Sequence, residues 1–250
     1  DTARAIAWHQ ENIYLLYDGY VRLVTTEGRE TARMPLPLTG DGTREPRRIR
    51  VMPDGGMLVA YQDHLILMNA SGELLHQSER QEGALFASIA WDGHRVYVSD
   101  GGNRKVFVYN EKLEETGGFA GESGVSDVHG FILPSLHFDM AVDAGQELWV
   151  VNPGLHQLQL YAPDGILRRH WGVSSFAEEG FSGCCNPYFI DFLSDGSFVT
   201  SEKGLVRVKV HHPSGRFTSY VAGPESFRSG KRAPALAITE KDQVLLLDFD

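Results

Sequence analysis

A pair of short apolar strands recurs along the chain at a fixed spacing. In the clearest copy, VYVSDGGNRKVFVYN at 96–110, a strand ends on Asp100, a glycine-rich turn follows, and a second strand begins at Val106. Two further copies start at Leu148 and Phe198, and in all three the second strand begins 10 residues after the first. Three copies in one register predict a β-repeat architecture, in which each copy belongs to one supersecondary unit.

The repeat extends over the whole chain. The second strand of each predicted unit follows the previous one at intervals of 39 to 52 residues, near Ile13, Met57, Val96, Leu148, Phe198 and Val244. Such a period accommodates four short strands, as in a propeller blade. Asp-Gly pairs at 54–55, 92–93 and 195–196 fall between first and second strands, where hairpins favour them. The sequence therefore predicts an all-β, six-bladed β-propeller of four-stranded antiparallel blades.

The predicted propeller forms one domain over residues 1–250. Its blades cover residues 3–37, 44–80, 84–122, 131–175, 184–224 and 233–250. The last blade has only two strands and is incomplete in this chain. Because an open blade exposes strand edges, we expect the natural gene product to continue past Asp250 or to have lost strands ahead of Asp1. The chain does not start on Met, which favours a processed product whose leader or anchor has been removed.

Composition limits the classes of function. The net charge is −10, and an acidic surface repels nucleic-acid phosphates, so no nucleic-acid partner is expected. A local basic cluster, formed by Arg44, Arg47, Arg48 and Arg50, is expected to be a solvated loop edge. The sequence has no run of 18 apolar residues, so no membrane span is predicted within it. Membrane association through a partner or a lost N-terminal anchor remains open.

The motif at 96–110 resembles an NHL repeat, in which a strand ends in Asp, Gly-Asn-x-Arg follows, and an apolar strand comes next. A closer resemblance covers about 129–226, where segments such as LWVVNPG and GFSGCCNP are similar to those of uncharacterised bacterial NHL-type propellers with a Gly-Cys-Cys-Asn-Pro segment. The resemblance implies the propeller fold. It implies no activity, because function depends on the site and not on the fold.

A site is expected on one face of the propeller. In this topology the first strand of each blade lines the central channel, and the loops before first strands and after second strands gather on one face. The candidate binding residues on that face are Asp100, Asn103, His137, Asn152, Asn186, Glu202 and Lys203. Asp100, Asn152 and Glu202 share one repeat position, where a polar residue could instead cap the turn and pair with a neighbouring blade.

Cys184 and Cys185 are the most unusual feature of the sequence. Neighbouring Cα atoms lie about 3.8 Å apart, below the usual disulfide range of roughly 4.4–6.8 Å. A disulfide between them would be strained and easily reduced, which suits a redox function. Two thiols near His137 could instead hold a soft metal ion or cluster. A third reading is that the pair only packs a tight turn before Asn186.

The favoured function is a non-catalytic, protein-binding scaffold or accessory subunit of a larger, extracytoplasmic or periplasmic, membrane-associated assembly. The alternatives are a metal-dependent lactonase- or lyase-like propeller enzyme, or a redox or cofactor-carrying subunit that uses Cys184 and Cys185. The chain contains no Gly-x-Ser-x-Gly elbow and no His-Glu-x-x-His motif. No catalytic residue is therefore assigned, and the only cofactor considered is a metal ion or cluster at the two cysteines.

Overall fold

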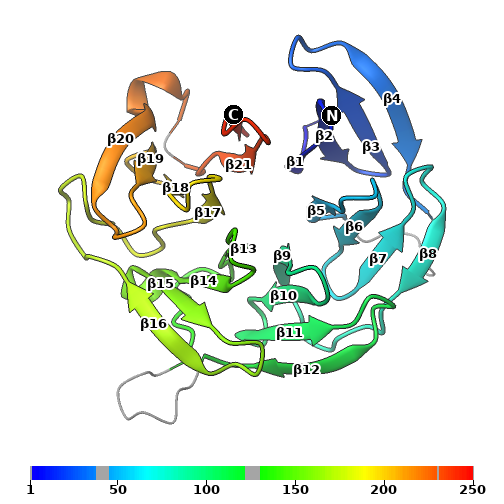
Figure 1. Ribbon diagram of the computed structural model, residues 1–250, viewed down its shortest axis with the longest axis horizontal. Helices are drawn as coiled ribbons and strands as arrows, with labels where there is room; N and C mark the ends of the chain where they lie inside the picture. Colours follow the sequence, from blue (N-terminus) through cyan, green and yellow to red (C-terminus); the bar gives the residue numbers. More distant parts are fainter. Residues whose placement is uncertain (1, 38–44, 122–129, 230, 250) are drawn as a thin grey trace.

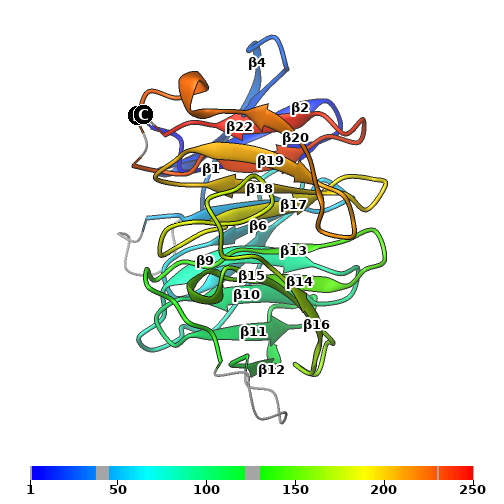
Figure 2. The same ribbon diagram turned by 90° about the vertical axis from the view of Figure 1, so that its left-hand side faces the viewer.

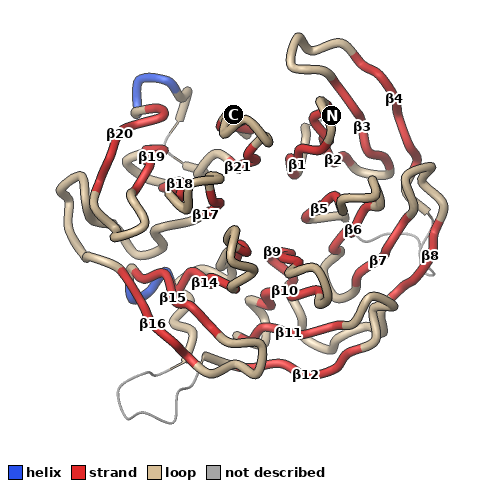
Figure 3. The backbone as a smooth tube through the Cα atoms, viewed as in Figure 1, coloured by secondary structure: helices blue, strands red, loops and turns tan. Residues whose placement is uncertain are grey.

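The computed structural model describes residues 2–37, 45–121, 130–229 and 231–249. In this part of the chain the fold is a β-propeller, with sheets arranged radially around a central channel (Figure 1). Strands and turns make up nearly all of it, and two short 3-10 helices, η1 (Pro153–Leu155) and η2 (Pro224–Ser226), interrupt the loops (Figure 3).

Five sheets have four antiparallel strands, ordered from the channel outwards. The first two blades contain β1 (Ala5–His9), β2 (Asn12–Tyr17), β3 (Tyr20–Val24), β4 (Glu30–Pro35), β5 (Arg48–Val51), β6 (Met57–Ala60), β7 (Leu65–Met68) and β8 (Leu74–Gln77). The third contains β9 (Phe86–Trp91), β10 (Val96–Asp100), β11 (Lys105–Tyr109) and β12 (Glu115–Phe119). The fourth and fifth contain β13 (Met140–Val142), β14 (Leu148–Asn152), β15 (Gln157–Tyr161), β16 (Leu167–Trp171), β17 (Phe189–Phe192), β18 (Phe198–Glu202), β19 (Arg207–His211) and β20 (Phe217–Ala222).

The predicted count of six blades is corrected to five four-stranded blades. The remaining strands, β21 (Ala235–Ile238) and β22 (Val244–Leu247), form a two-stranded sheet within the described residues. Strand β21 lies between β17 and β1, so six inner strands surround the channel although only five belong to four-stranded blades (Figure 1). The sequence prediction of two strands in this last unit is confirmed.

Local chemistry explains the hairpins. At Asp54-Gly55 the glycine has a φ of +84°, and the Asp54 carboxylate accepts a hydrogen bond from the Gly56 amide at 2.9 Å. The Asp195 carboxylate accepts one from the Ser197 amide at 2.8 Å in the corresponding turn. These turns require a left-handed backbone, which glycine adopts without a steric penalty.

The hydrophobic core lies between blades and not inside one compact centre. Each cluster joins side chains of adjacent sheets. Leu16 of the first blade packs with Met57 of the second, and Leu65 of the second blade belongs to one cluster with Phe107 of the third. Fully burying one such side chain contributes about 1.5–3 kcal/mol. Face-to-face packing of neighbouring sheets therefore fixes the inner strands and the loops that enter them.

Those loops define the two faces of the disc, which Figure 2 shows edge-on. The inner strands all start on one face, which we call the leading face. It carries the loops that precede inner strands, here called leading loops, and the loops that follow second strands, such as the one after Glu202. The candidate residues of the sequence prediction belong to these loops and the strand ends beside them.

Candidate functional site

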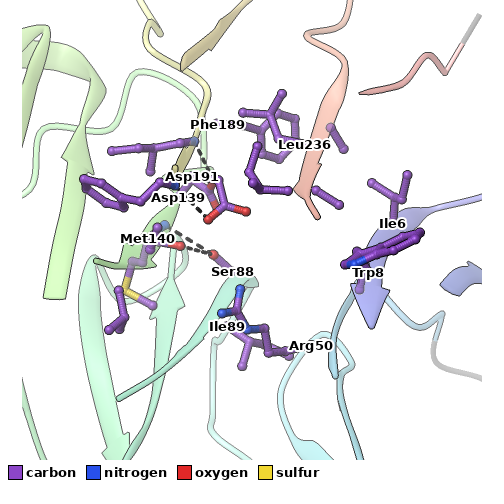
Figure 4. Close-up of a pocket in the computed structure, with 18 of the residues that line it drawn as sticks. Ile6, Trp8, Arg50, Ser88, Ile89, Asp139, Met140, Phe189, Asp191 and Leu236 are labelled. Atoms are coloured by element: carbon purple, nitrogen blue, oxygen red, sulfur yellow. Dashed lines mark hydrogen bonds between the residues drawn. The ribbon is translucent and has the colours of Figure 1, made fainter. Parts of the chain in front are cut away.

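The central channel contains a cavity of about 410 Å³, lined by the six inner strands. Apolar side chains such as Ile6, Ile89 and Leu236 form part of the wall, and charged groups interrupt it (Figure 4). A concave pocket into which several polar groups converge is a candidate binding site. Four of the charged groups belong to β5, β17 and the residue just before β13.

Arg48 and His137 meet at the leading end of the channel. Arg48 Nη2 lies 3.2 Å from His137 Nδ1, and His137 Nε2 lies 3.1 Å from the Tyr188 carbonyl oxygen. A guanidinium only donates hydrogen bonds, so Nδ1 must accept and the proton of the neutral imidazole is on Nε2. Burial, reinforced by the charge of Arg48, lowers the pKa of His137 well below its ordinary value. His137 is therefore neutral and held in one orientation.

Arg48 is partly buried, and its guanidinium has no anionic partner among the described residues. Its Nη1 donates to the Arg47 carbonyl at 2.7 Å, and its Nε is buried without a hydrogen-bond partner. Among the residues that the structure describes, no carboxylate lies within 4 Å of its nitrogens. Burial lowers the pKa of Arg48, and the charge of Asp139 opposes this. The guanidinium therefore retains donors that a ligand could use.

Asp139 lies two residues beyond His137 and faces the same channel (Figure 4). Its Oδ2 accepts a hydrogen bond from the Ile190 amide at 2.9 Å. Burial raises its pKa to about 6, although Ser88, the Ile190 amide and Arg48 act in the opposite direction. A carboxyl group with this pKa changes its protonation state just below neutral pH, so Asp139 can act as a proton donor or as an acceptor in the channel.

Two more charged side chains, Arg50 and Asp191, lie further along the channel. Arg50 follows Arg48 on the same face of β5, and Asp191 lies on β17 (Figure 4). Burial raises the pKa of Asp191, while the charge of Arg50 and a 2.9 Å hydrogen bond from the Phe192 amide lower it. The lining of this one cavity thus includes two arginines together with Asp139 and Asp191, and three further acidic residues, Asp143, Glu240 and Asp242, line it as well.

Cys184 and Cys185 lie in the leading loop of the fifth blade. Both are free thiols, with Cys184 exposed, Cys185 buried, and 3.1 Å between the two sulfur atoms. Asn186 closes this loop against Lys203: its Oδ1 accepts from the Lys203 amide at 2.9 Å, and its Nδ2 donates to the Lys203 carbonyl at 2.9 Å. Lys203 Nζ lies 5.0 Å from the Tyr188 ring centroid, which brings Lys203 to the side of the His137–Tyr188 stack.

Within 2–37, 45–121, 130–229 and 231–249, no group of three or more His, Cys, Asp or Glu side chains is arranged to hold a metal ion. The two cysteines therefore have no third ligand of these types beside them among these residues. Nor is any helix there long and apolar enough to cross a membrane.

Asp100 and Asn152 occupy matching positions and make matching bonds. Asp100 Oδ1 accepts from the Leu85 amide at 2.7 Å, and Asn152 Oδ1 accepts from the Ile132 amide at 2.9 Å. In each blade the end of the second strand thereby fastens the leading loop of the same blade. Asn103 extends the first of these networks by donating to Asp100 Oδ2 at 2.7 Å. A role of these three residues in ligand binding stays a prediction, and their side chains already serve the loops.

Glu202, at the matching position of the fifth blade, acts on its leading loop indirectly, through two cations. It is fully buried and pairs with Arg207 at 2.8 Å and with Lys209 at 2.8 Å. Lys209 Nζ in turn donates to the Glu178 carbonyl at 3.0 Å and the Gly180 carbonyl at 2.7 Å in the leading loop. The alternative of pairing with a neighbouring blade is thus wrong for this repeat position, because the partners lie within the same blade.

Of the predicted residues, the structure brings His137, Cys184, Cys185, Asn186 and Lys203 together, whereas the side chains of Asp100, Asn103 and Asn152 bind groups of the leading loops. The sequence prediction missed Arg48, Arg50, Asp139 and Asp191. The signal was present, because 48 and 50, like 139 and 141 or 189 and 191, alternate on predicted inner strands, where every second residue faces the channel. Arg48 and Arg50 are not a solvated edge, and Arg44 lies outside the described residues.

The fold defines a β-propeller, and comparisons with known proteins agree. A Bacteroides caccae protein of unknown function has a TM-score of 0.66 and 15% identity, over 90% of this chain and 83% of that one. Virginiamycin B lyase from Staphylococcus aureus has a TM-score of 0.61 and 11% identity, over 99% and 84%. A Bacteroides thetaiotaomicron protein of unknown function has a TM-score of 0.67 and 14% identity, over 100% and 67%.

At these identities the similarity extends to the fold alone. No protein-family model matches the chain, and no curated protein matches it significantly. The resemblance to NHL repeats accordingly stays a prediction, whereas the propeller architecture is established.

Proposed function

We propose that this chain is a non-catalytic binding propeller that docks a protein partner on its leading face, with a carboxylate of the partner on Arg48. The observation that carries the proposal is the guanidinium of Arg48, whose Nε is buried without a hydrogen-bond partner and which has no carboxylate within salt-bridge distance among the described residues. A buried charge without a partner is costly. A ligand carboxylate would supply the missing anion and the missing acceptors.

The charge around Arg48 supports an anionic ligand. Arg47 and Lys203 join Arg48 in acting electrostatically on His137, so three cations gather at the leading end of the channel. This concentration contrasts with the net charge of −10 of the whole chain. The local positive site attracts a carboxylate, whereas the acidic remainder of the surface repels an extended polyanion. The expected partner therefore carries one or a few acidic groups beside apolar ones.

The surroundings support a protein and not only a small molecule. Leu136, Phe176 and Leu205 all lie in loops of the leading face and are 50%, 85% and 48% exposed. The His137 and Tyr188 rings stack at 4.0 Å beside the arginine. Exposed apolar side chains around a rigid aromatic and arginine centre are the usual composition of a protein interface. An extracytoplasmic assembly as the setting stays a prediction.

The test compares affinity capture from the native source by wild-type protein and by Arg48→Met. Loss of the specific partner in Arg48→Met, with retention in the control Arg29→Met, supports the proposal. Arg29 is an exposed arginine in the turn after β3, on the opposite face. The proposal also expects the free energy of unfolding of Arg48→Met to be unchanged or raised by about 1–3 kcal/mol, because the substitution removes an unpaired buried charge.

Capture of the same partner by Arg48→Met at wild-type yield would overturn the proposal. So would a native source that yields only the free monomer. A drop of several kcal/mol in the unfolding free energy of Arg48→Met would assign the arginine to the fold.

An enzymatic function is the second candidate, and Asp139 favours it. Its pKa of about 6 suits proton transfer near neutral pH, and two of the structures with this fold are streptogramin B and virginiamycin B lyases. The test is incubation with virginiamycin B, comparing wild type with Asp139→Asn. Turnover that disappears in Asp139→Asn would favour this candidate, and unchanged substrate would remove it for this reaction.

A further inference from the structure

The two cysteines differ in every property that governs thiol chemistry, although they are neighbours. Cys184 is exposed, whereas Cys185 is only 3% exposed. Their sulfur atoms lie 3.1 Å apart, so one thiol donates to the other. Neither is engaged in a disulfide. The pair is therefore a reduced dithiol with one sulfur at the surface and one behind it.

The neighbours of Cys185 favour its ionised form. Burial opposes ionisation, but the Cys184 thiol, the Ser135 side chain and the Lys203 ammonium together lower the pKa of Cys185 below its ordinary value. The same contact raises the pKa of Cys184, chiefly because its thiol donates to Cys185. The thiolate is the nucleophilic form of cysteine. The roles are therefore divided, with Cys185 as the nucleophile and Cys184 as the neutral thiol beside it.

Lys203 is held where this electrostatic support is needed. Its backbone is bonded on both sides to the Asn186 side chain, which follows Cys185 directly in the chain. The same loop therefore positions the thiolate and the cation that stabilises it. No comparable arrangement is required for packing a turn, since small uncharged residues would fill it.

We infer that Cys185 reacts with hydroperoxides and that Cys184 resolves the product to a vicinal disulfide. In the first step the Cys185 thiolate attacks the terminal peroxide oxygen and the O–O bond breaks. Cys185 becomes a sulfenic acid, and the alkoxide or hydroxide that leaves takes up one proton to give an alcohol or water. In the second step Cys184 attacks that sulfur, the S–S bond forms, and water leaves. A small dithiol then returns both cysteines to thiols and is itself oxidised to a disulfide.

Burial selects the oxidant. The thiol of a cysteine residue that is 3% exposed is reached by hydrogen peroxide or a small organic hydroperoxide, whereas a protein disulfide is too large. Because neighbouring Cα atoms cannot span the usual disulfide distance, the product is strained and readily reduced. The inference concerns the loop before β17 and does not depend on the proposed binding of a partner.

The first experiment treats the reduced full chain with one equivalent of hydrogen peroxide and follows both thiols by alkylation and mass spectrometry. We expect both thiols to disappear together into an intramolecular disulfide, and dithiothreitol to restore them. Persistence of both thiols, oxidation of Cys184 alone, or a product linked only between chains would overturn the inference.

Variants separate the two roles. In Cys184→Ser we expect Cys185 to stop at the sulfenic acid, which a cyclic 1,3-diketone traps. In Cys185→Ser we expect Cys184 to react at least about tenfold more slowly. Circular dichroism establishes that each variant is folded. A Cys184→Ser protein that forms no trapped adduct would contradict the assignment.

The cation provides the final control. We expect Lys203→Met to slow the first oxidation step about fivefold, because thiolate stabilisation is lost. The matched substitution Lys241→Met, at an exposed lysine in the turn between β21 and β22, should leave the rate unchanged. Equal rates in Lys203→Met and wild type would remove the lysine from the site and with it the assignment of Cys185.

Discussion

Asp139 should destabilise the folded protein at neutral pH, and the size of this effect follows from its pKa. The folded value is about 6 and the ordinary value is 3.8. A carboxyl group whose pKa is raised on folding contributes stability that is complete below the unfolded pKa and is lost as the pH rises through the folded pKa. For this pair of values, the loss between pH 4 and pH 7.5 amounts to about 2.5 kcal/mol.

The substitution Asp139→Asn isolates the contribution of Asp139 ionisation to the free energy of unfolding. The amide oxygen can still accept the hydrogen bond from the Ile190 amide, and the cost of the exchange itself does not depend on pH. We therefore expect the stability of Asp139→Asn relative to wild type to improve by about 2.5 kcal/mol on going from pH 4 to pH 7.5. The comparison must be between variants, since His137 and His211 have lowered pKa values and give the wild type a slope of opposite sign.

The assay is urea-induced unfolding of both proteins at several pH values between 4 and 7.5, followed by tryptophan fluorescence. Leu236→Ala is the control, because Leu236 lines the same channel and carries no titratable group. Its effect on stability should be the same at every pH. A difference between Asp139→Asn and wild type that is equally independent of pH would refute the argument, since Asp139 would then ionise alike in the folded and unfolded chains.

Three further expectations follow from other buried groups. Burial, reinforced by the charge of Lys209, lowers the pKa of His211 to about 3, so wild type should lose about 3 kcal/mol relative to His211→Phe between pH 7 and pH 4 in the same urea assay. Glu202→Gln leaves Lys209 without its counter-ion at 0% exposure and should lower the unfolding free energy by about 3–5 kcal/mol, measured at pH 7. Gly215→Ala should lower it by about 2–4 kcal/mol, because the new Cβ would lie 1.8 Å from Trp171 Nε1 at a φ of +88°; an unchanged midpoint would contradict the packing described.

The strands could be predicted closely from the sequence, because spacing and turn chemistry are local. The predicted second strands at Met57, Val96, Leu148, Phe198 and Val244 begin where β6, β10, β14, β18 and β22 begin. Apolar alternation and Asp-Gly turns act within a few residues, so one chain segment contains all the information needed.

The site could be predicted only in part, because it depends on which strands face each other across the channel. Arg48 and His137 are 89 residues apart in the chain and meet only when the second, third and fourth blades pack side by side. The cysteine pair was visible as a motif, but the assignment of the thiolate to Cys185 required the position of Lys203. Long-range pairing of this kind leaves no periodic trace in a single sequence.

The shared position at the ends of β10, β14 and β18 was recognisable as a repeat, whereas its task was not. Asp100, Asn152 and Glu202 bind backbone groups or cations whose own residue types follow no common pattern. A backbone amide such as that of Leu85 carries no signature of the acceptor that it meets.

Because polar side chains hold the leading loops in this way, the sequence of the leading face can change in evolution while the blades stay the same. Each of the three leading loops is held by polar side chains of the strands and turns beside it, and the strands on both sides are set by packing against adjacent sheets. Residues can therefore be inserted, deleted or exchanged in a leading loop, between its hydrogen-bonded backbone group and the neighbouring strand, without moving the inner strands. A new recognition surface can be grafted onto the disc one loop at a time, provided that the polar side chains that bind the loop keep a backbone group within it as their partner.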